Sequence, residues 1–294
     1  MDRIIKCYAL NKKALVTVAS TTKLIEEIKN IHDLTPTTSA VLGRIATMGT
    51  IMAHTSMKDE NENITIQITG DGEVEKIICV ASLEGKKSKV KIYCKNSKVE
   101  LPLKENGKID VSGALGKTGY LNVIKENKIT NKSYNGLVPL VSGEIAEDFT
   151  EYYAKSEQKP TVVALGVLVN KDGIKSAGGY MINLMPEATE EDIIKLENAV
   201  NNADSISKML EDNKSLEEIA KIVTSDPEIE ILEDNLETEY SCNCNEDRIK
   251  RGIILLNKED FEEIFKYEEK INVKCEFCNK EYNFYKEDFE KRLI

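Results

Sequence analysis

The sequence predicts an α+β protein in three parts, namely an N-terminal mixed α/β core, a helical linker and a small C-terminal α+β domain that carries a cysteine cluster. Three observations support this prediction. Strand and helix signals alternate through residues 1–182, an acidic helical pattern follows over residues 183–238, and four of the seven cysteines lie within residues 239–294. A chain of 294 residues is long enough for two or three domains, since single domains usually contain about 100 to 200 residues.

The core is predicted from short β-branched runs and one long apolar segment. Four such runs, typical of strands, lie at residues 13–20, 63–70, 74–82 and 88–96. Residues 36–57 are apolar around most of a helical circumference, which predicts a buried helix. A second helix is predicted over residues 144–158. It precedes an apolar strand at 161–170, whose partner strand follows the turn Asn-Lys-Asp-Gly.

The linker is predicted to be helical because strand signals stop after Pro186. Thr189 precedes a helix with acidic residues in its first turn, and Ser215 forms a capping box with Glu218 ahead of another helix. The apolar stripe of that helix consists of Leu216, Ile219, Ala220 and Val223. With 4 basic and 16 acidic residues the segment has a net charge of −12, and self-repulsion lowers its stability. We expect this stripe to pack on another surface of the chain.

The last segment carries a C-x-C pair, Cys242 and Cys244, and after 30 intervening residues a C-x-x-C pair, Cys275 and Cys278. Helices are predicted near residues 245–256 and 258–268, followed by a hairpin and a short final helix. Two such pairs can converge on one metal, and four thiolates suit a tetrahedral Zn²⁺ with Zn–S bonds of about 2.3 Å. The sequence therefore predicts one Zn²⁺ per chain in a small zinc-binding domain.

Two interpretations of this zinc site remain open from the spacing alone. The first is a structural site with no other role. The second is a redox site, because thiolates that bind zinc are also the groups that oxidants attack, and each pair contains two potential disulfide partners. Since structural zinc can contribute about 10 to 16 kcal/mol to the folding of a small domain, oxidation would then unfold the segment.

Composition excludes several other classes. The N-terminus lacks an uninterrupted apolar stretch, and no segment approaches the roughly 18 apolar residues that cross a bilayer, so we expect a cytosolic protein without membrane contact. A secreted disulfide framework fits poorly, because Cys7, Cys79 and Cys94 are scattered through strand-like runs. We expect these three thiols to be inert core residues.

No catalytic constellation is predicted. His32 and His54 are the only two histidines, and no Ser/Asp pattern surrounds them, so a structural role is expected. The carboxylate pair Glu147 and Asp148 is expected to lie on a solvated helix face.

Several motifs extend the cysteine pattern along the chain. They are Ser-Gly-Glu-Ile-Ala-Glu-Asp-Phe at residues 142–149, Tyr152-Tyr153 followed by Ser-Glu-Gln at 156–158, and Gly-Gly-Tyr at 178–180. Together with the C-x-C and C-x-x-C pairs, in this order and at this length, they resemble the redox-regulated heat shock protein 33 family, the 33 kDa chaperonins. The resemblance covers essentially the whole chain.

The resemblance implies an ATP-independent holdase chaperone, not an enzyme, that is inactive while reduced and zinc-bound. Oxidation combined with mild unfolding would form the disulfides Cys242–Cys244 and Cys275–Cys278, release zinc and unfold the zinc domain and linker. Apolar surface would then capture unfolding client proteins and protect them from heat and oxidative stress. The core domain would bind clients and form a homodimer in the active oxidised state.

Two rival functions are weaker. A zinc-ribbon nucleic-acid binder needs a basic zinc domain, whereas residues 239–294 have a net charge of −3 and their neighbour −12. A thiol-disulfide oxidoreductase places C-x-x-C at the start of a helix in a βαβ unit, whereas Cys275 and Cys278 fall in a predicted hairpin beside a second cysteine pair.

Overall fold

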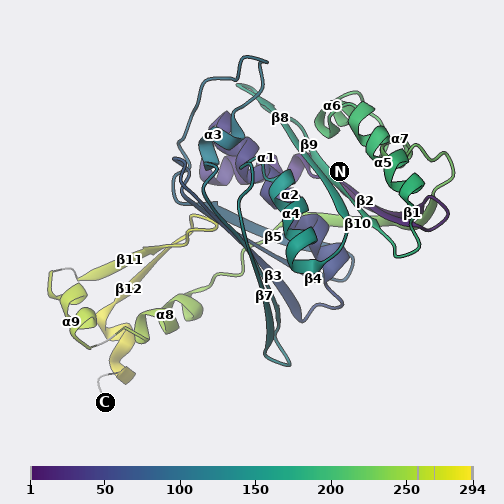
Figure 1. Ribbon diagram of the computed structural model, residues 1–294. Helices are drawn as coiled ribbons and strands as arrows, with labels where there is room; N and C mark the ends of the chain where they lie inside the picture. Colours follow the sequence, from purple (N-terminus) through teal and green to yellow (C-terminus); the bar gives the residue numbers. More distant parts are fainter. Residues whose placement is uncertain (1, 257, 268, 293–294) are drawn as a thin grey trace. The chain divides into compact units, whose positions relative to one another are not determined.

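The computed structural model describes residues 2–256, 258–267 and 269–292 and is shown in Figure 1. Contacts within the chain divide it into two compact units, Met1–Tyr240 and Ser241–Ile294. The predicted division of the first part into a core of residues 1–182 and a linker of residues 183–238 stays a prediction. The mixture of a large sheet with helices confirms the predicted α+β class.

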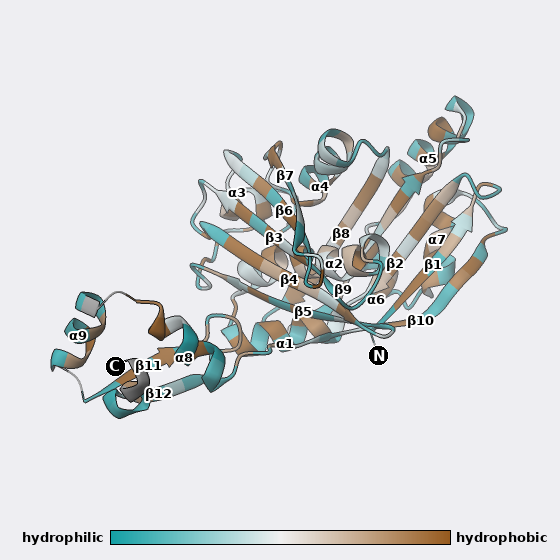
Figure 2. Ribbon diagram, turned by 90° about the horizontal axis from the view of Figure 1, so that it is seen from below, coloured by the Kyte–Doolittle hydropathy of each residue, from teal (hydrophilic) through white to brown (hydrophobic). Residues whose placement is uncertain are grey.

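The first unit is built on one ten-stranded sheet with the order β7-β6-β3-β4-β5-β10-β1-β2-β9-β8. Its strands are β1 (Arg3–Ala9), β2 (Ala14–Ser20), β3 (Glu62–Gly70), β4 (Lys76–Glu84), β5 (Lys87–Cys94), β6 (Gly119–Asn127), β7 (Lys132–Pro139), β8 (Thr161–Asn170), β9 (Gly173–Leu184) and β10 (Glu230–Tyr240). Neighbours along the described sheet are antiparallel except β5 and β10, which are parallel. In Figure 2 brown and teal residues alternate along several strands, as expected where one face of a strand is buried.

Helix α2 (Pro36–Ser56) is the centre of the main core. Its residues from Thr37 to His54 are buried, with Arg44 as the exception, which confirms the predicted buried helix. The Thr35 hydroxyl caps it by accepting a hydrogen bond from the Thr38 amide at 3.1 Å. Gly43 permits close approach to β8, because a Cβ at this position would lie 2.7 Å from Val167 Cγ2. The other helices of the first unit that precede β8 are α1 (Thr22–His32), α3 (Val111–Leu115), α4 (Ala146–Tyr152) and the π-helical turn Tyr153–Glu157.

Three further helices cover a separate apolar face formed by β1, β2 and β9. They are α5 (Glu190–Asn202), α6 (Ile206–Glu211) and α7 (Leu216–Thr224). The caps predicted at Thr189 and Ser215 are both confirmed. All four residues of the predicted α7 stripe are buried in one cluster with side chains of β1 and β2, namely Leu216, Ile219, Ala220 and Val223. The apolar stripe of α7 is therefore buried, as the sequence predicted, and the structure shows that it packs on the sheet.

Strand β10 corrects the expectation of a purely helical linker. It occupies Glu230–Tyr240 and pairs with β1 on one side and β5 on the other. Five of its eleven residues are acidic, so its local pattern resembles a solvated segment rather than a strand. The strand forms because two sheet edges far away in sequence supply its backbone hydrogen bonds and lysine side chains.

The expectation that Asp148 lies on a solvated helix face is wrong. Asp148 is fully buried, and its carboxylate accepts hydrogen bonds from the amides of Val141, Ser142, Gly143 and Ile145 at 2.8–3.3 Å. It thereby fixes the turn that begins α4. Because this turn includes Ile145 at a φ of 72°, a conformation that is costly for a β-branched residue, the carboxylate stabilises a backbone that would otherwise be strained.

The second unit contains α8 (Glu246–Ile254), α9 (Lys258–Tyr267), the hairpin strands β11 (Lys270–Lys274) and β12 (Glu281–Tyr285), and a 3₁₀ segment (Lys286–Arg292). The predicted helices and hairpin are confirmed over the described residues, and position 268 of the second predicted helix lies outside them. The apolar core described for this unit has five buried side chains, which are Ile253, Phe261, Tyr282, Phe284 and Phe289. Such a small core gives little burial energy of its own. Among the described residues of the whole chain, no helix is both long and apolar enough to span a membrane.

Candidate metal centre

The four candidate ligands lie on two short segments of the second unit. Cys242 and Cys244 follow the end of β10 at Tyr240 and precede Asn245, whose side chain caps α8 by accepting a hydrogen bond from the Arg248 amide at 2.8 Å. This cap fixes the chain direction directly after Cys244.

The second ligand segment is the turn between β11 and β12. The Cys275 amide donates a hydrogen bond to the Lys280 carbonyl at 2.9 Å, and the Asn279 amide donates to the Cys275 carbonyl at 2.8 Å. Asn279 has a φ of 60°, which Asn tolerates better than most residues. The tight turn turns the Cys275 and Cys278 sulfurs to the same side, as a C-x-x-C metal clip requires.

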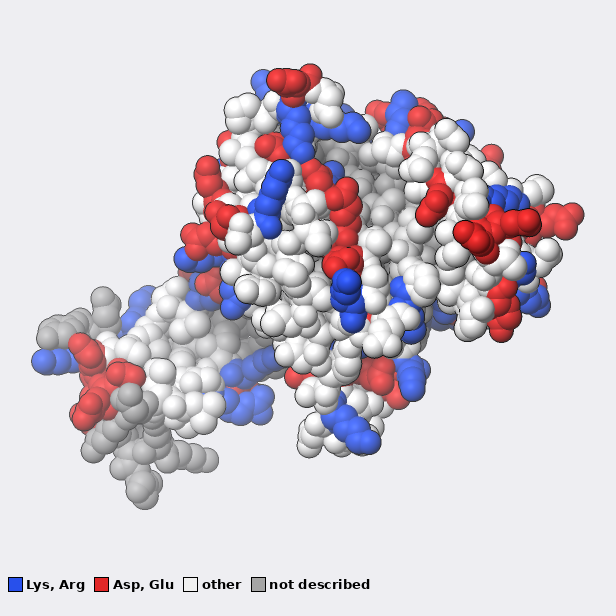
Figure 3. All heavy atoms as spheres, viewed as in Figure 1, with Lys and Arg blue, Asp and Glu red and all other residues white. Residues whose placement is uncertain are grey.

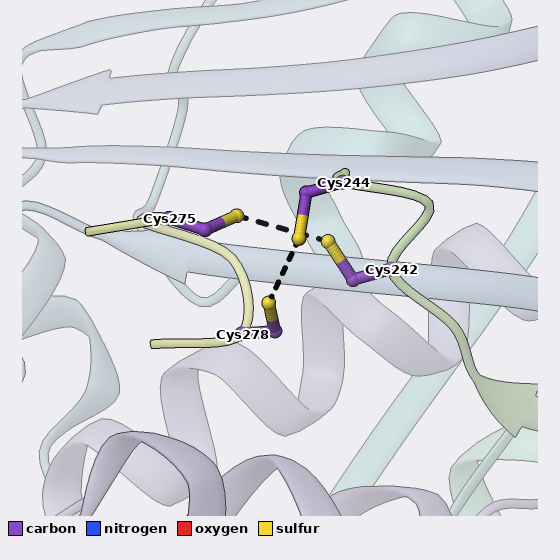
Figure 4. A group of neighbouring side chains, drawn as sticks. All are labelled: Cys242, Cys244, Cys275 and Cys278. Carbon is purple, nitrogen blue, oxygen red and sulfur yellow. Dashed lines mark hydrogen bonds between the residues drawn. The ribbon is translucent and has the colours of Figure 1, made fainter. Parts of the chain in front are cut away.

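The four sulfur atoms converge, as Figure 4 shows. Cys242 Sγ lies 3.8 Å from Cys275 Sγ, Cys244 Sγ lies 3.3 Å from Cys278 Sγ, and all four lie within 4.8 Å of one another. A regular tetrahedron with Zn–S bonds of 2.3 Å has sulfur–sulfur edges of about 3.8 Å. The residues therefore fit a four-thiolate metal site, and the structure brings together all four ligands that the sequence predicted.

The thiols of this cluster differ in acidity. Burial raises the pKa of Cys244, but hydrogen bonds from Tyr282 and the neighbouring thiols outweigh burial and lower this pKa to about 7. Burial is also the main reason why the pKa of Cys278 rises to about 12, and it raises the pKa of Cys242. Cys244 is therefore the thiol that loses its proton most readily. Its thiolate is stabilised by hydrogen bonds from the neighbouring side chains.

Tyr282 contacts the cysteine cluster and was not among the residues that the sequence predicted. Its hydroxyl lies 3.2 Å from Cys244 Sγ and also 3.2 Å from the Cys244 carbonyl oxygen, and Lys280 Nζ lies 5.1 Å from the centre of its ring. It also belongs to the small core of the unit. The sequence signal that could have identified Tyr282 was its position four residues after Cys278. There it lies on the second strand of the hairpin, which runs back toward the C-x-C pair.

Replacing Tyr282 with Phe is expected to weaken metal binding about tenfold and to speed the oxidation of Cys244 by peroxide. The lost hydroxyl leaves the thiolate with one supporting donor fewer, and partners of metal ligands typically contribute about 10- to 100-fold in affinity. Competition with a chromogenic zinc chelator measures the affinity, and zinc release under peroxide measures the rate. Tyr285→Phe is the matched control, because Tyr285 lies on the same strand and is 47% exposed. Equal affinities of the two variants would contradict this role of Tyr282.

The remaining three cysteines belong to the other unit and are not part of this cluster. Cys7, Cys79 and Cys94 are buried in the first unit, and burial raises their pKa values to about 11, 12 and 12. They stay protonated at neutral pH and react slowly with oxidants. His54 is also buried, burial lowers its pKa, and its Nε2 lies 3.2 Å from the Glu237 carbonyl of β10.

Taken together, the fold and the site define a two-unit protein with a large sheet domain and a small C-terminal unit whose four clustered cysteines could hold a metal ion. A family model described as Hsp33 protein matches residues 2–285. The chain belongs to the Hsp33 family of chaperones.

Individual relatives agree with this assignment over nearly the full length. The 33 kDa chaperonin of Clostridioides difficile is 40% identical over 287 residues, which covers 98% of this chain and 97% of that protein. The 33 kDa chaperonin of Acetivibrio thermocellus is 41% identical over 288 residues and covers 98% and 95%. The crystal structure of the 33 kDa chaperonin (Hsp33) from Thermotoga maritima matches with a TM-score of 0.86 at 32% identity, covering 99% of this chain and 97% of the other.

Proposed function

We propose that this chain is a redox-regulated, ATP-independent holdase that is inactive while reduced and zinc-bound and is activated when its four ligand cysteines are oxidised. The observation that carries the proposal is the convergence of Cys242, Cys244, Cys275 and Cys278 within 4.8 Å, in a unit whose described apolar core is small. The fold of such a unit depends on its metal, so loss of the ligands unfolds it.

The chemistry resides in the cysteine sulfurs. When bound, Zn²⁺ would keep all four sulfurs deprotonated and join the two segments that carry them. Two thiolates, one hydrogen peroxide and two protons give one disulfide and two water molecules, so two equivalents of peroxide oxidise the whole cluster. Sulfurs in disulfides are no longer thiolate ligands, so the oxidised cysteines would no longer hold a metal ion.

We propose the pairs Cys242–Cys244 and Cys275–Cys278. In the folded unit close sulfur contacts also run between the segments, from Cys242 to Cys275 at 3.8 Å and from Cys244 to Cys278 at 3.3 Å, so folded geometry alone does not favour the proposed pairs. Partners within a segment, however, are separated by only one or two residues and stay close after the unit unfolds. The proposal thus requires that unfolding and the completion of disulfide formation go together.

The activated state would expose the apolar sheet face that α5, α6 and α7 cover. This face includes Val16 and Val18 of β2 and Tyr180 and Ile182 of β9, which are buried under the linker helices. Only Ser241 separates the end of β10 from Cys242, so unfolding of the second unit begins next to the linker. The proposal further includes unfolding client proteins as partners, a homodimer in the oxidised state and a cytosolic location, all supported by the family resemblance.

The rival functions receive less support. Cys275 and Cys278 lie in a hairpin turn and not at the start of a helix, which is unfavourable for a thiol-disulfide oxidoreductase. The face of the molecule drawn in Figure 3 shows acidic and basic side chains interspersed rather than one extended basic surface, which gives no support to nucleic-acid binding.

The test compares reduced protein with protein treated with peroxide at mildly raised temperature. We expect only the treated protein to suppress aggregation of a heat-denatured client without ATP, after releasing one zinc per chain. Peptide mapping should find Cys242 bridged to Cys244 and Cys275 to Cys278, with Cys7, Cys79 and Cys94 as free thiols, because buried protonated thiols are shielded. Equal suppression by the reduced protein would refute the redox switch, and bridges between the segments would refute the pairing.

A further inference from the structure

Strand β10 joins two halves of the sheet that otherwise do not touch along their edges. It is antiparallel to β1 and parallel to β5, and it is the one described strand of the sheet that follows residue 184. Without β10, β1 and β5 would face each other across a slot one strand wide, with two rows of unpaired backbone donors and acceptors. Such edges are templates for an added strand.

On its inner face β10 carries apolar and small side chains at alternate positions. Leu236 is buried in the main core, and the Thr238 hydroxyl lies 3.1 Å from the Thr50 hydroxyl of α2. The backbone is bound as well, because the Glu237 amide donates to the Lys86 carbonyl at 3.0 Å and the Glu237 carbonyl accepts from the Ser88 hydroxyl at 3.3 Å. Most of these contacts would accept another extended segment of similar pattern.

The outer face of the slot is basic and β10 is acidic. Ion pairs join Glu230 to Lys12 at 2.8 Å, Glu233 to Lys6 at 2.8 Å and Glu237 to Lys87 at 3.2 Å, while Glu239 pairs with both Lys87 and Lys89. Such partly exposed pairs are weak and screened by salt, and the acidic residues of β10 repel one another. The lysines thus favour a strand whose outward-facing residues are acidic or uncharged, but they do not bind that strand tightly.

The pairing of β10 is also short and irregular. Its parallel ladder with β5 spans Glu237 to Tyr240, and its ladder with β1 contains register shifts on either side of Lys6. By contrast, β1 and β2 pair without interruption from Arg3 to Ala9. A strand with few regular hydrogen bonds, next to a segment that unfolds on oxidation, is the one most readily displaced.

We propose that β10 is a displaceable strand, and that the slot between β1 and β5 binds an extended segment of an unfolded client that has apolar residues at alternate positions and acidic or uncharged residues between them. The interaction is strand addition through backbone hydrogen bonds, which every polypeptide offers, so it recognises unfolded chains without a fixed sequence. This inference rests on the proposed function, because oxidation is what frees β10.

The test uses a labelled synthetic peptide of residues 229–240 as the probe. It should bind the oxidised protein and reduce its capture of a client at least tenfold, and it should bind the reduced protein at least tenfold more weakly, since β10 fills the slot there. The matched control has the same side chains but N-methyl groups at Glu237 and Glu239, whose amides face β5 by the alternation of the strand. A scrambled peptide controls for composition and charge.

Each outcome has a separate meaning. Loss of binding on N-methylation supports strand addition, whereas equal binding of the methylated peptide overturns it. No competition by any peptide, while the oxidised protein still holds clients, overturns the slot and leaves the proposed function intact. Failure of the oxidised protein to hold clients refutes the proposed function itself. If the peptide instead converts oxidised dimers to monomers, measured by sedimentation, without displacing client, the slot is filled by β10 of a second copy and the client proposal is wrong.

Discussion

Replacing Ile219 with Asp is expected to make the holdase active under reducing conditions while zinc stays bound. Ile219 is 0% exposed, in the middle of the α7 stripe that packs on β1 and β2. An unpaired carboxylate at this position costs several kcal/mol, which is comparable with the whole stability of a small domain. Helix α7 should therefore detach and uncover the apolar sheet face without any oxidation.

Ile222→Asp provides the matched control on the same helix. Ile222 is 36% exposed, so its carboxylate remains solvated and the variant should stay inactive until oxidised. The measurement is aggregation of a heat-denatured client with each reduced variant, together with zinc content and proteolysis of the linker. If Ile219→Asp is inactive although its linker is cleaved readily, the linker helices do not cover the client surface, and the second unit itself restrains activity.

Removing zinc from the reduced protein with a chelator is expected to unfold the second unit and leave the first folded. The described core of the second unit has five buried side chains, whereas metal binding contributes about 10 to 16 kcal/mol in small zinc domains. Hydrogen exchange measured by mass spectrometry should show protection lost in peptides of residues 241–294 and retained in the strands of the first unit.

A pair of cysteine variants separates this effect from general loss of stability. Cys275→Ser removes one of the four converging ligands and should reproduce the exchange pattern of the zinc-free protein. Cys94→Ser changes a thiol buried in the first unit and should keep its zinc and the protection of residues 241–294. If the zinc-free protein retains full protection in residues 241–294, the metal does not hold the unit together. Loss of zinc would then not explain how oxidation of the cysteines unfolds the linker.

Local sequence patterns made the cysteine cluster predictable. The two cysteine pairs have the spacing of metal clips, and a tight turn and a helix cap suffice to orient them, so all four sulfurs converge as expected. The position of α2 was predictable for a similar reason. Pro36 marks its start, and a helix that is apolar around most of its circumference is expected to be buried. The caps at Thr189 and Ser215 depend on contacts within four residues and were likewise predictable.

Features that depend on the shape of an irregular turn or on partners distant in sequence could not be predicted in this way. Asp148 looked like a surface residue because its amide donors belong to a turn whose shape the sequence does not reveal. Tyr282 meets Cys244 only because the hairpin returns to a segment 38 residues earlier.

By itself, the sequence determined the α+β class, the four candidate ligand cysteines and the apolar stripe of α7, since each follows from periodicity or spacing along the chain. The tertiary structure decided where that stripe packs, how the Cys244 thiol is supported, and that the acidic segment Glu230–Tyr240 becomes the strand that joins the sheet. The physical reason is that a strand takes its hydrogen bonds from its neighbours. An acidic run with little strand propensity therefore becomes β-structure when two distant edges offer both backbone partners and lysines.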